Sequence, residues 1–212
     1  MLDDCIQRGL TAEQGGAVYN FTGPQGFGIA NVSDSLYAIR KLVYEDKKVS
    51  MEDYKEALAW NYDKGLDEKS VSDMTEMILK GMQEGGMEID TDTAKAVLQT
   101  VMRLKPSEEQ LRKFTELHHM IDEVPKFGNA IEDVDYFARD VAYTYTRPIQ
   151  NYRNPRGGQF HAGLYPVSAN VPLGGQTGAT PDGRYAHTPV ADGVSPSAGK
   201  DVNGPTAAAT SV

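Results

Sequence analysis

Residues 19–36, with the sequence YNFTGPQGFGIANVSDSL, decide how the chain is interpreted, because a glycine-rich stretch passes there directly into a helical pattern. The glycines of Gly23–Gly28 follow the order G-x-x-G-x-G, which differs from the G-x-G-x-x-G of a dinucleotide-binding loop. We therefore interpret this stretch as a tight turn. After Ser33, apolar residues recur at spacings of three and four as far as Val43, which predicts an amphipathic helix.

The remainder of residues 1–150 predicts a mainly helical region. Ser50 and Ser107 each begin a pattern typical of a capped helix N-terminus, with an acidic or amide side chain three positions on. Gly65 and Pro148 are expected to end helices, because glycine favours the position after a helix and proline cannot continue one freely. The helices predicted after the first span about 50–65, 71–84, 92–104, 107–121 and 131–147.

Residues 151–212 have a different composition, with 10 of the 21 glycines, 7 of the 11 prolines and seven charged residues. Their varied sequence argues against a flexible linker and predicts tightly turning backbone packed against other structure. Phe160–Val167 has the composition of a strand, and Pro166 restricts it to a strand end or edge. In such a strand, residues 161, 163, 165 and 167 share one face.

Charge and cysteine content exclude several classes of function. The net charge is −9 and the pI about 4.9, which argues against binding nucleic acid or an anionic membrane. The sequence contains neither the ~18 consecutive apolar residues of a membrane span nor an apolar signal peptide, so we expect a cytoplasmic protein. Cys5 is the single cysteine and lies among acidic residues, which favours a structural role. His118 and His119 point about 100° apart on a helix, so no metal site is expected.

Three segments, 19–36, 152–174 and 178–212, resemble glycyl radical enzymes of the pyruvate formate-lyase superfamily, and most of all its glycerol and diol dehydratase-like branch. The third contains the recognisable motif TPDGR at 180–184. The resemblance implies an α/β fold, in which this chain would form part of a ten-stranded barrel with surrounding helices. It also implies one partial barrel domain over residues 1–212, mainly helical over 1–150 and built of barrel strand and loops over 151–212.

The resemblance implies radical chemistry in the complete protein. A separate radical S-adenosylmethionine activase would install a glycyl radical, and no other cofactor is expected to be bound. A cysteine in a G-C-V-E-like loop would then abstract hydrogen from a small-molecule substrate, and side chains able to transfer protons would assist the loss of water. Family members are commonly homodimers, so the activase, the substrate and a second copy are the expected partners.

Both radical motifs are missing from the printed sequence, which contains neither G-C-V-E nor R-V-x-G-Y. We therefore expect an internal-to-late piece of a longer protein that holds no catalytic radical residue and is inactive alone. The missing radical motifs also make a non-catalytic truncated remnant the alternative hypothesis. A half-barrel of this kind would leave strand edges unpaired and tend to aggregate or associate.

By resemblance, His161, Tyr165 and Val167 are the candidate substrate-binding residues, since Tyr165 and Val167 match positions that line the diol pocket in related enzymes. Ordinary barrel core is the competing interpretation for all three. Thr180, Pro181, Asp182, Gly183 and Arg184 form a turn signature and are expected to be architectural.

The resemblance indicates a dehydratase or another lyase that cleaves a carbon–heteroatom bond, with glycerol or propane-1,2-diol as substrate class. Hydroxyproline dehydratase, choline lyase and formate C-acetyltransferase activities remain open, because most pocket residues would lie outside this sequence.

Overall fold

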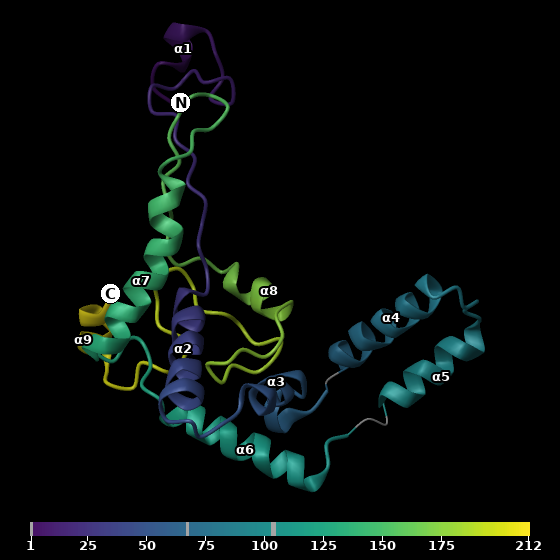
Figure 1. Ribbon diagram of the computed structural model, residues 1–212. Helices are drawn as coiled ribbons and strands as arrows, with labels where there is room; N and C mark the ends of the chain where they lie inside the picture. The colour runs from purple at the N-terminus through teal and green to yellow at the C-terminus, as the bar shows by residue number, and fades with distance from the viewer. Residues whose placement is uncertain (1, 67, 103–104) are drawn as a thin grey trace.

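A largely buried helix, α2 (Ile29–Ile39), lies at the centre of the computed structural model, which describes residues 2–66, 68–102 and 105–212 (Figure 1). Gly28 has a φ of 71°, a left-handed conformation that suits glycine and turns the chain into the helix. The helix begins before the apolar pattern that follows Ser33, and the Ser33 hydroxyl donates to the Ala30 carbonyl inside it. A short π-helix, η1 (Arg40–Glu45), continues from α2.

Helix α3 (Met51–Ala59) begins as predicted, with the Ser50 side chain accepting a hydrogen bond from the Asp53 backbone N–H. Its predicted extension to Gly65 is wrong. Asn61 and Tyr62 have φ values of 54° and 55°, which interrupt the helix before the 3₁₀ turn η2 (Tyr62–Lys64).

Helix α6 (Glu108–Glu123) opens with the predicted capping box between Ser107 and Gln110. The prediction that Pro148 ends the next helix is wrong by one residue, since α7 (Glu132–Ile149) includes it. Pro148 lies in the last turn of α7, where a missing backbone N–H disturbs few further hydrogen bonds.

The hydrophobic core lies where α2, α3, α6 and α7 meet, and Figure 1 shows α6 and α7 on two sides of α2. Removing these side chains from water is the main stabilising contribution, about 25 cal/mol per Å² of apolar area. The largest fully buried apolar side chains are Tyr54, Tyr62, Val101, Ile121 and Val134.

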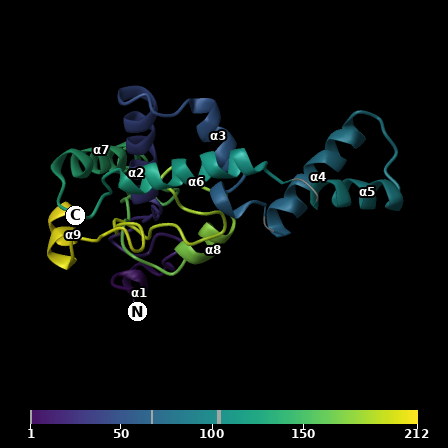
Figure 2. The same ribbon diagram turned by 90° about the horizontal axis from the view of Figure 1, so that it is seen from below.

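Helices α4 (Glu68–Glu84) and α5 (Thr91–Met102) pack against each other and project from this body as a hairpin (Figure 2). Both lie close to their predicted ranges. Residues 103 and 104, which the prediction placed in the second helix, lie outside the described residues.

The glycine- and proline-rich region, residues 151–212, follows α7 as turns with two short helices, α8 (Asn170–Gly175) and α9 (Pro205–Ser211). Its first part joins the segment after α1 (Cys5–Arg8) in a narrow arm (Figure 1). The strand expected over Phe160–Val167 is reduced to isolated bridges, parallel between Thr22 and Phe160 and between Gln25 and Gly163. Within the described residues these bridges form no barrel.

Candidate functional site

The loop Thr180–Arg184 is a turn held by its own backbone hydrogen bonds. The Gly183 N–H donates to the Thr180 carbonyl at 3.1 Å, and the Thr180 N–H donates to the Arg184 carbonyl at 3.0 Å. Gly183 takes a φ of 92°, which favours glycine. Both hydrogen bonds join residues of the loop itself, so the turn does not depend on neighbouring segments for its closure.

Arg184 binds backbone carbonyls around this loop. Its guanidinium donates to the carbonyls of Gly178, Tyr185 and Thr188, the last at 2.6 Å. Burial lowers the pKa of the guanidinium from its ordinary value. The five planar donors of arginine suit this role, which supports architecture rather than chemistry for the motif.

Asp182 fixes the loop to helix α2. Its carboxylate accepts a hydrogen bond from the Asn31 amide at 2.6 Å, and its backbone N–H donates to the Ser35 hydroxyl at 3.1 Å. The same Asn31 side chain accepts from the Ala191 N–H at 2.7 Å. One face of α2 therefore carries polar side chains that hold the second half of the chain.

Two buried tyrosines hold the other side of the loop. The Tyr54 hydroxyl donates to the Pro181 carbonyl at 2.6 Å, and the Tyr62 hydroxyl donates to the Thr180 carbonyl at 2.7 Å. Burial raises the pKa of both phenols, so each remains a hydrogen-bond donor at neutral pH.

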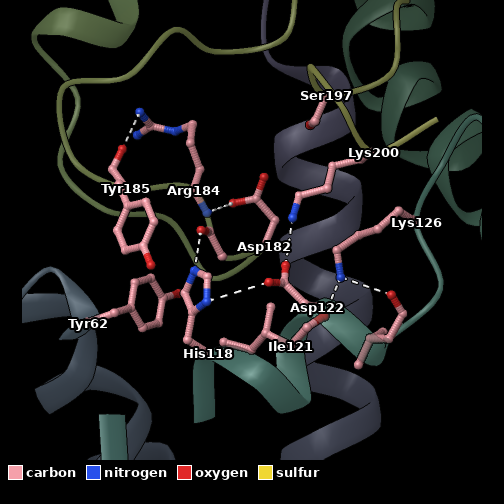
Figure 3. Close-up of polar contacts among 12 residues, drawn as sticks. Tyr62, His118, Ile121, Asp122, Lys126, Asp182, Arg184, Tyr185, Ser197 and Lys200 are labelled. Carbon is pink, nitrogen blue, oxygen red and sulfur yellow. Dashed lines mark hydrogen bonds and ion pairs between the residues drawn. The ribbon is translucent and has the colours of Figure 1, made fainter. Parts of the chain in front are cut away.

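His118, on α6, reaches the same loop (Figure 3). Its Nε2 lies 2.9 Å from the Gly183 carbonyl, so this nitrogen carries the proton, and its ring stacks on Tyr185 with centroids 4.8 Å apart. Its Nδ1 lies 3.5 Å from Asp122, which binds the Lys200 ammonium at 2.6 Å. His118 is therefore a half-buried structural contact, whereas His119 beside it is exposed.

Asp34 and Lys126 are ionisable groups buried beneath the loop. Asp34 Oδ1 accepts from the Phe127 N–H at 2.9 Å, and its Oδ2 has no hydrogen-bond partner among the described residues. Burial raises the pKa of Asp34 to about 7, while burial lowers the pKa of Lys126, whose ammonium donates to the Val124 and Ile121 carbonyls. Each charge partly offsets the desolvation of the other.

The candidate substrate-binding residues lie elsewhere, where the arm meets the body. Here the backbone around Thr22–Gly26 runs parallel to Gln159–Gly163, with His161 N–H donating to the Thr22 carbonyl at 2.9 Å. Tyr165 is 59% and Val167 37% exposed, and His161 is also exposed, its ring meeting the Phe21 ring edge-on at 5.4 Å. The structure thus brings the three residues to one exposed segment and buries none of them.

Sequence reasoning missed the roles of Asn31, Asp34, His118 and Lys126. One signal was available for Asp34, because Ser33–Ser35 is a polar run within an apolar helix pattern. The structure buries all three of these residues. The others contact residues far away in the sequence, which no local pattern reveals.

The described residues contain no group of three or more histidine, cysteine, aspartate or glutamate side chains placed to hold a metal ion. No helix in the described ranges has the length and apolar character that crossing a membrane requires.

Comparison with known proteins shows which family has this sequence and architecture. The family model for pyruvate formate lyase-like proteins matches residues 1–174. The solved structure for 1,2-propanediol dehydration in Roseburia inulinivorans superposes with a TM-score of 0.92, at 56% identity over 99% of this chain and 25% of that one. The B12-independent glycerol dehydratase from Clostridium butyricum gives a TM-score of 0.70, at 39% identity over 100% of this chain and 21% of that one.

The probable dehydratase YbiW of Escherichia coli is 36% identical over 100% of this chain and 21% of its own length. The chain thus spans about a fifth to a quarter of the relatives that it matches. With a family model over residues 1–174 and these dehydratases as relatives, the chain belongs to the pyruvate formate lyase-like family of glycyl radical enzymes, in its dehydratase branch.

Proposed function

We propose that the complete gene product is a glycyl radical dehydratase that removes water from a small diol, either propane-1,2-diol or glycerol. The observation that carries this proposal is the 56% identity over 99% of the chain to the protein of 1,2-propanediol dehydration in Roseburia inulinivorans. The glycerol dehydratase from Clostridium butyricum, at 39% identity, supports the same substrate class.

In this proposal residues 1–212 are one partial barrel domain, helical over 1–150 and glycine- and proline-rich over 151–212. The radical cysteine and glycine belong to other parts of the gene product, so this chain alone is inactive. The complete protein is a cytoplasmic homodimer that receives its radical from a radical S-adenosylmethionine activase. The radical supplies hydrogen abstraction from the substrate carbon.

His161, Tyr165 and Val167 form the exposed segment that we call the candidate wall. Their side chains would bind and orient the diol. The Tyr165 hydroxyl offers both a donor and an acceptor to a substrate hydroxyl, and Val167 offers an apolar contact to the carbon chain. His161 can hold or release a proton near neutral pH, which suits the loss of a hydroxyl group as water. Their exposure in this chain supports the proposal, because a pocket wall must present its side chains to a ligand.

The test is anaerobic activation of the complete gene product with its activase. Electron paramagnetic resonance should detect a glycyl radical, and the activated protein should convert propane-1,2-diol to propanal or glycerol to 3-hydroxypropanal. Protein without activase is the matched control. Radical-bearing protein that converts hydroxyproline or choline, or transfers an acetyl group to formate, but converts neither diol, would contradict the proposed substrate class. Absence of any radical signal would favour the non-catalytic remnant.

A further inference from the structure

Three successive backbone carbonyls around Tyr165 are bound by three different donors. The Gly163 carbonyl accepts from the Gly26 N–H at 2.8 Å, and the Leu164 carbonyl accepts from the Val194 N–H at 2.9 Å. The Tyr165 carbonyl accepts instead from a side chain, the Gln25 amide nitrogen Nε2, at 2.5 Å. Only this third bond can be removed by changing a side chain.

The Gln25 side chain supplies a hydrogen bond at the point where the backbone pairing ends. In a parallel pair each strand alternately donates to and accepts from its neighbour, so the next rung after Gly26 would link Gly28 to Tyr165. The Gly28 N–H donates to the Ala191 carbonyl at 2.8 Å instead, because the chain turns there into α2. Gln25 therefore supplies the donor that the backbone no longer offers to Tyr165.

Gly163 leaves the space in which Gln25 and Tyr165 meet. A Cβ added at residue 163 would lie 2.8 Å from Gln25 Oε1 and 2.9 Å from Tyr165 Cε1. Gln25 Oε1 is itself buried without a hydrogen-bond partner among the described residues. Because reversing the amide would bring Oε1 against the Tyr165 carbonyl, the hydrogen bond through Nε2 fixes the orientation of the whole side chain.

Gln25 is in turn held by the body of the protein. The Tyr145 hydroxyl on α7 donates to the Pro24 carbonyl at 2.6 Å. A Cβ added at Gly26 would lie 3.0 Å from the Tyr145 ring, so the backbone on either side of Gln25 packs against α7. Tyr165, by contrast, is 59% exposed, so few contacts of its own ring fix its place.

We infer that Gln25 is a positioning residue, which sets the place of Tyr165 in the diol pocket through the bond from Nε2 to the Tyr165 carbonyl and through its packing at Gly163. The inference rests on the proposed role of Tyr165 in binding substrate. Gln25 acts on specificity and affinity by placing the Tyr165 hydroxyl, without touching the substrate itself.

The kinetic test uses the complete, activated gene product. Gln25→Met keeps the length of the side chain and removes the N–H donor, so KM for propane-1,2-diol should rise about tenfold at unchanged radical content, since small misplacements of binding groups are costly. A purely structural defect would lower kcat together with the radical signal and leave KM unchanged. Gln176→Met, at an exposed glutamine beyond α8, is the matched control.

A double-mutant cycle asks whether the effect passes through Tyr165. In a Tyr165→Phe background, Gln25→Met should change KM by less than about threefold, because the hydroxyl that it misplaces is already gone. An equal fold-change in both backgrounds, or a KM within about twofold of wild type in the single variant, would overturn the inference. Gly163→Ala should raise KM as Gln25→Met does, and Gly178→Ala, whose Cβ would have nothing within 4 Å, should not.

Crystal structures of the complete wild-type protein and its Gln25→Met variant separate this inference from the proposed function. Displacement of the Tyr165 ring by about 1 Å or more supports the inference even when the protein converts no diol. A Tyr165 ring that coincides in the two structures overturns it, even when diol dehydration is confirmed.

Discussion

Tyr165 presents one hydroxyl group that can be removed with little effect on packing, since its side chain is 59% exposed. If Tyr165 binds the diol as proposed, Tyr165→Phe in the complete, activated protein should lower kcat/KM about tenfold, because its hydrogen bond to the substrate would be lost. The melting temperature should change little. Steady-state kinetics and thermal unfolding measure the two quantities.

Tyr152 offers the matched control for this substitution, because it is 63% exposed and precedes the candidate wall. Tyr152→Phe should leave kcat/KM unchanged. Equal kinetics for Tyr165→Phe and wild type would remove Tyr165 from the site and leave Val167 and His161 as the candidates.

Asp34 makes the stability of this chain depend on pH. Its pKa is raised to about 7 by burial, so the folded state binds this proton more tightly than the unfolded state does. Stability contributed by the protonated carboxyl is therefore present below about pH 4 and is lost as pH rises towards 7. The pKa of Lys126 is lowered from its ordinary value of 10.5. Stability contributed by its neutral amine is therefore present above about pH 10.5 and is lost as pH falls below that value. Asp182, Asp122 and Lys200 are the other charged groups that face this pair.

Asp34→Asn isolates this effect, because asparagine cannot ionise. The free energy of unfolding of wild type relative to the variant should fall by up to about 1.4 kcal/mol per pH unit between pH 4 and 7. Urea unfolding followed by the fluorescence of Trp60, the single tryptophan, measures it. A difference that stays constant from pH 4 to 8 would show that Asp34 does not titrate in this range.

At the scale of elements, the turn at η2 connects the helical body to the loop Thr180–Arg184. Tyr62 lies there with a φ of 55° and no exposed surface, and its hydroxyl binds the Thr180 carbonyl. The His118 ring meets the Tyr62 ring edge-on, with centroids 4.9 Å apart. The strained backbone at Tyr62 is thus compensated by contacts with two distant segments.

Tyr62→Phe should destabilise the protein by about 0.5–1.5 kcal/mol, since the Thr180 carbonyl would lose this donor and keep the Gly183 N–H as its partner. Tyr44→Phe is the control, because Tyr44 is 65% exposed and its change should stay within about 0.5 kcal/mol. Urea unfolding followed by circular dichroism measures both. Equal stability of the two variants would mean that water replaces the Tyr62 hydroxyl.

The same elements show which parts of the structure the sequence could predict. The caps at Ser50 and Ser107 were predictable because a cap involves residues three positions apart. The end of α3 was not, because Tyr62 is held by Thr180, 118 positions away. Gln25 and Tyr165 are 140 positions apart, so their contact has no local signature. The family motifs predicted His161, Tyr165 and Val167 as substrate-binding residues, whereas the contacts that hold this segment required the structure.

The whole molecule combines a buried helical body with an arm that presents large apolar side chains to solvent. Tyr19 is 88%, Phe21 59% and Tyr152 63% exposed. The relatives that share this architecture are four to five times as long as the part that matches this chain. Exposed apolar surface of this kind is typical of an interface with further protein.

Hydrogen exchange on this chain and on the complete gene product should therefore differ by region. In both proteins the amides of α2, α6 and α7 should exchange slowly, because these helices form the buried core. Amides of residues 19–26 and 159–165 should exchange at least about tenfold faster in this chain than in the complete protein, where further segments would cover the wall. The exposed hairpin of α4 and α5 is an internal reference for helices outside the core. Equal protection of the arm in both proteins would mean that its own hydrogen bonds, including Gln25 to Tyr165, suffice to fix the wall.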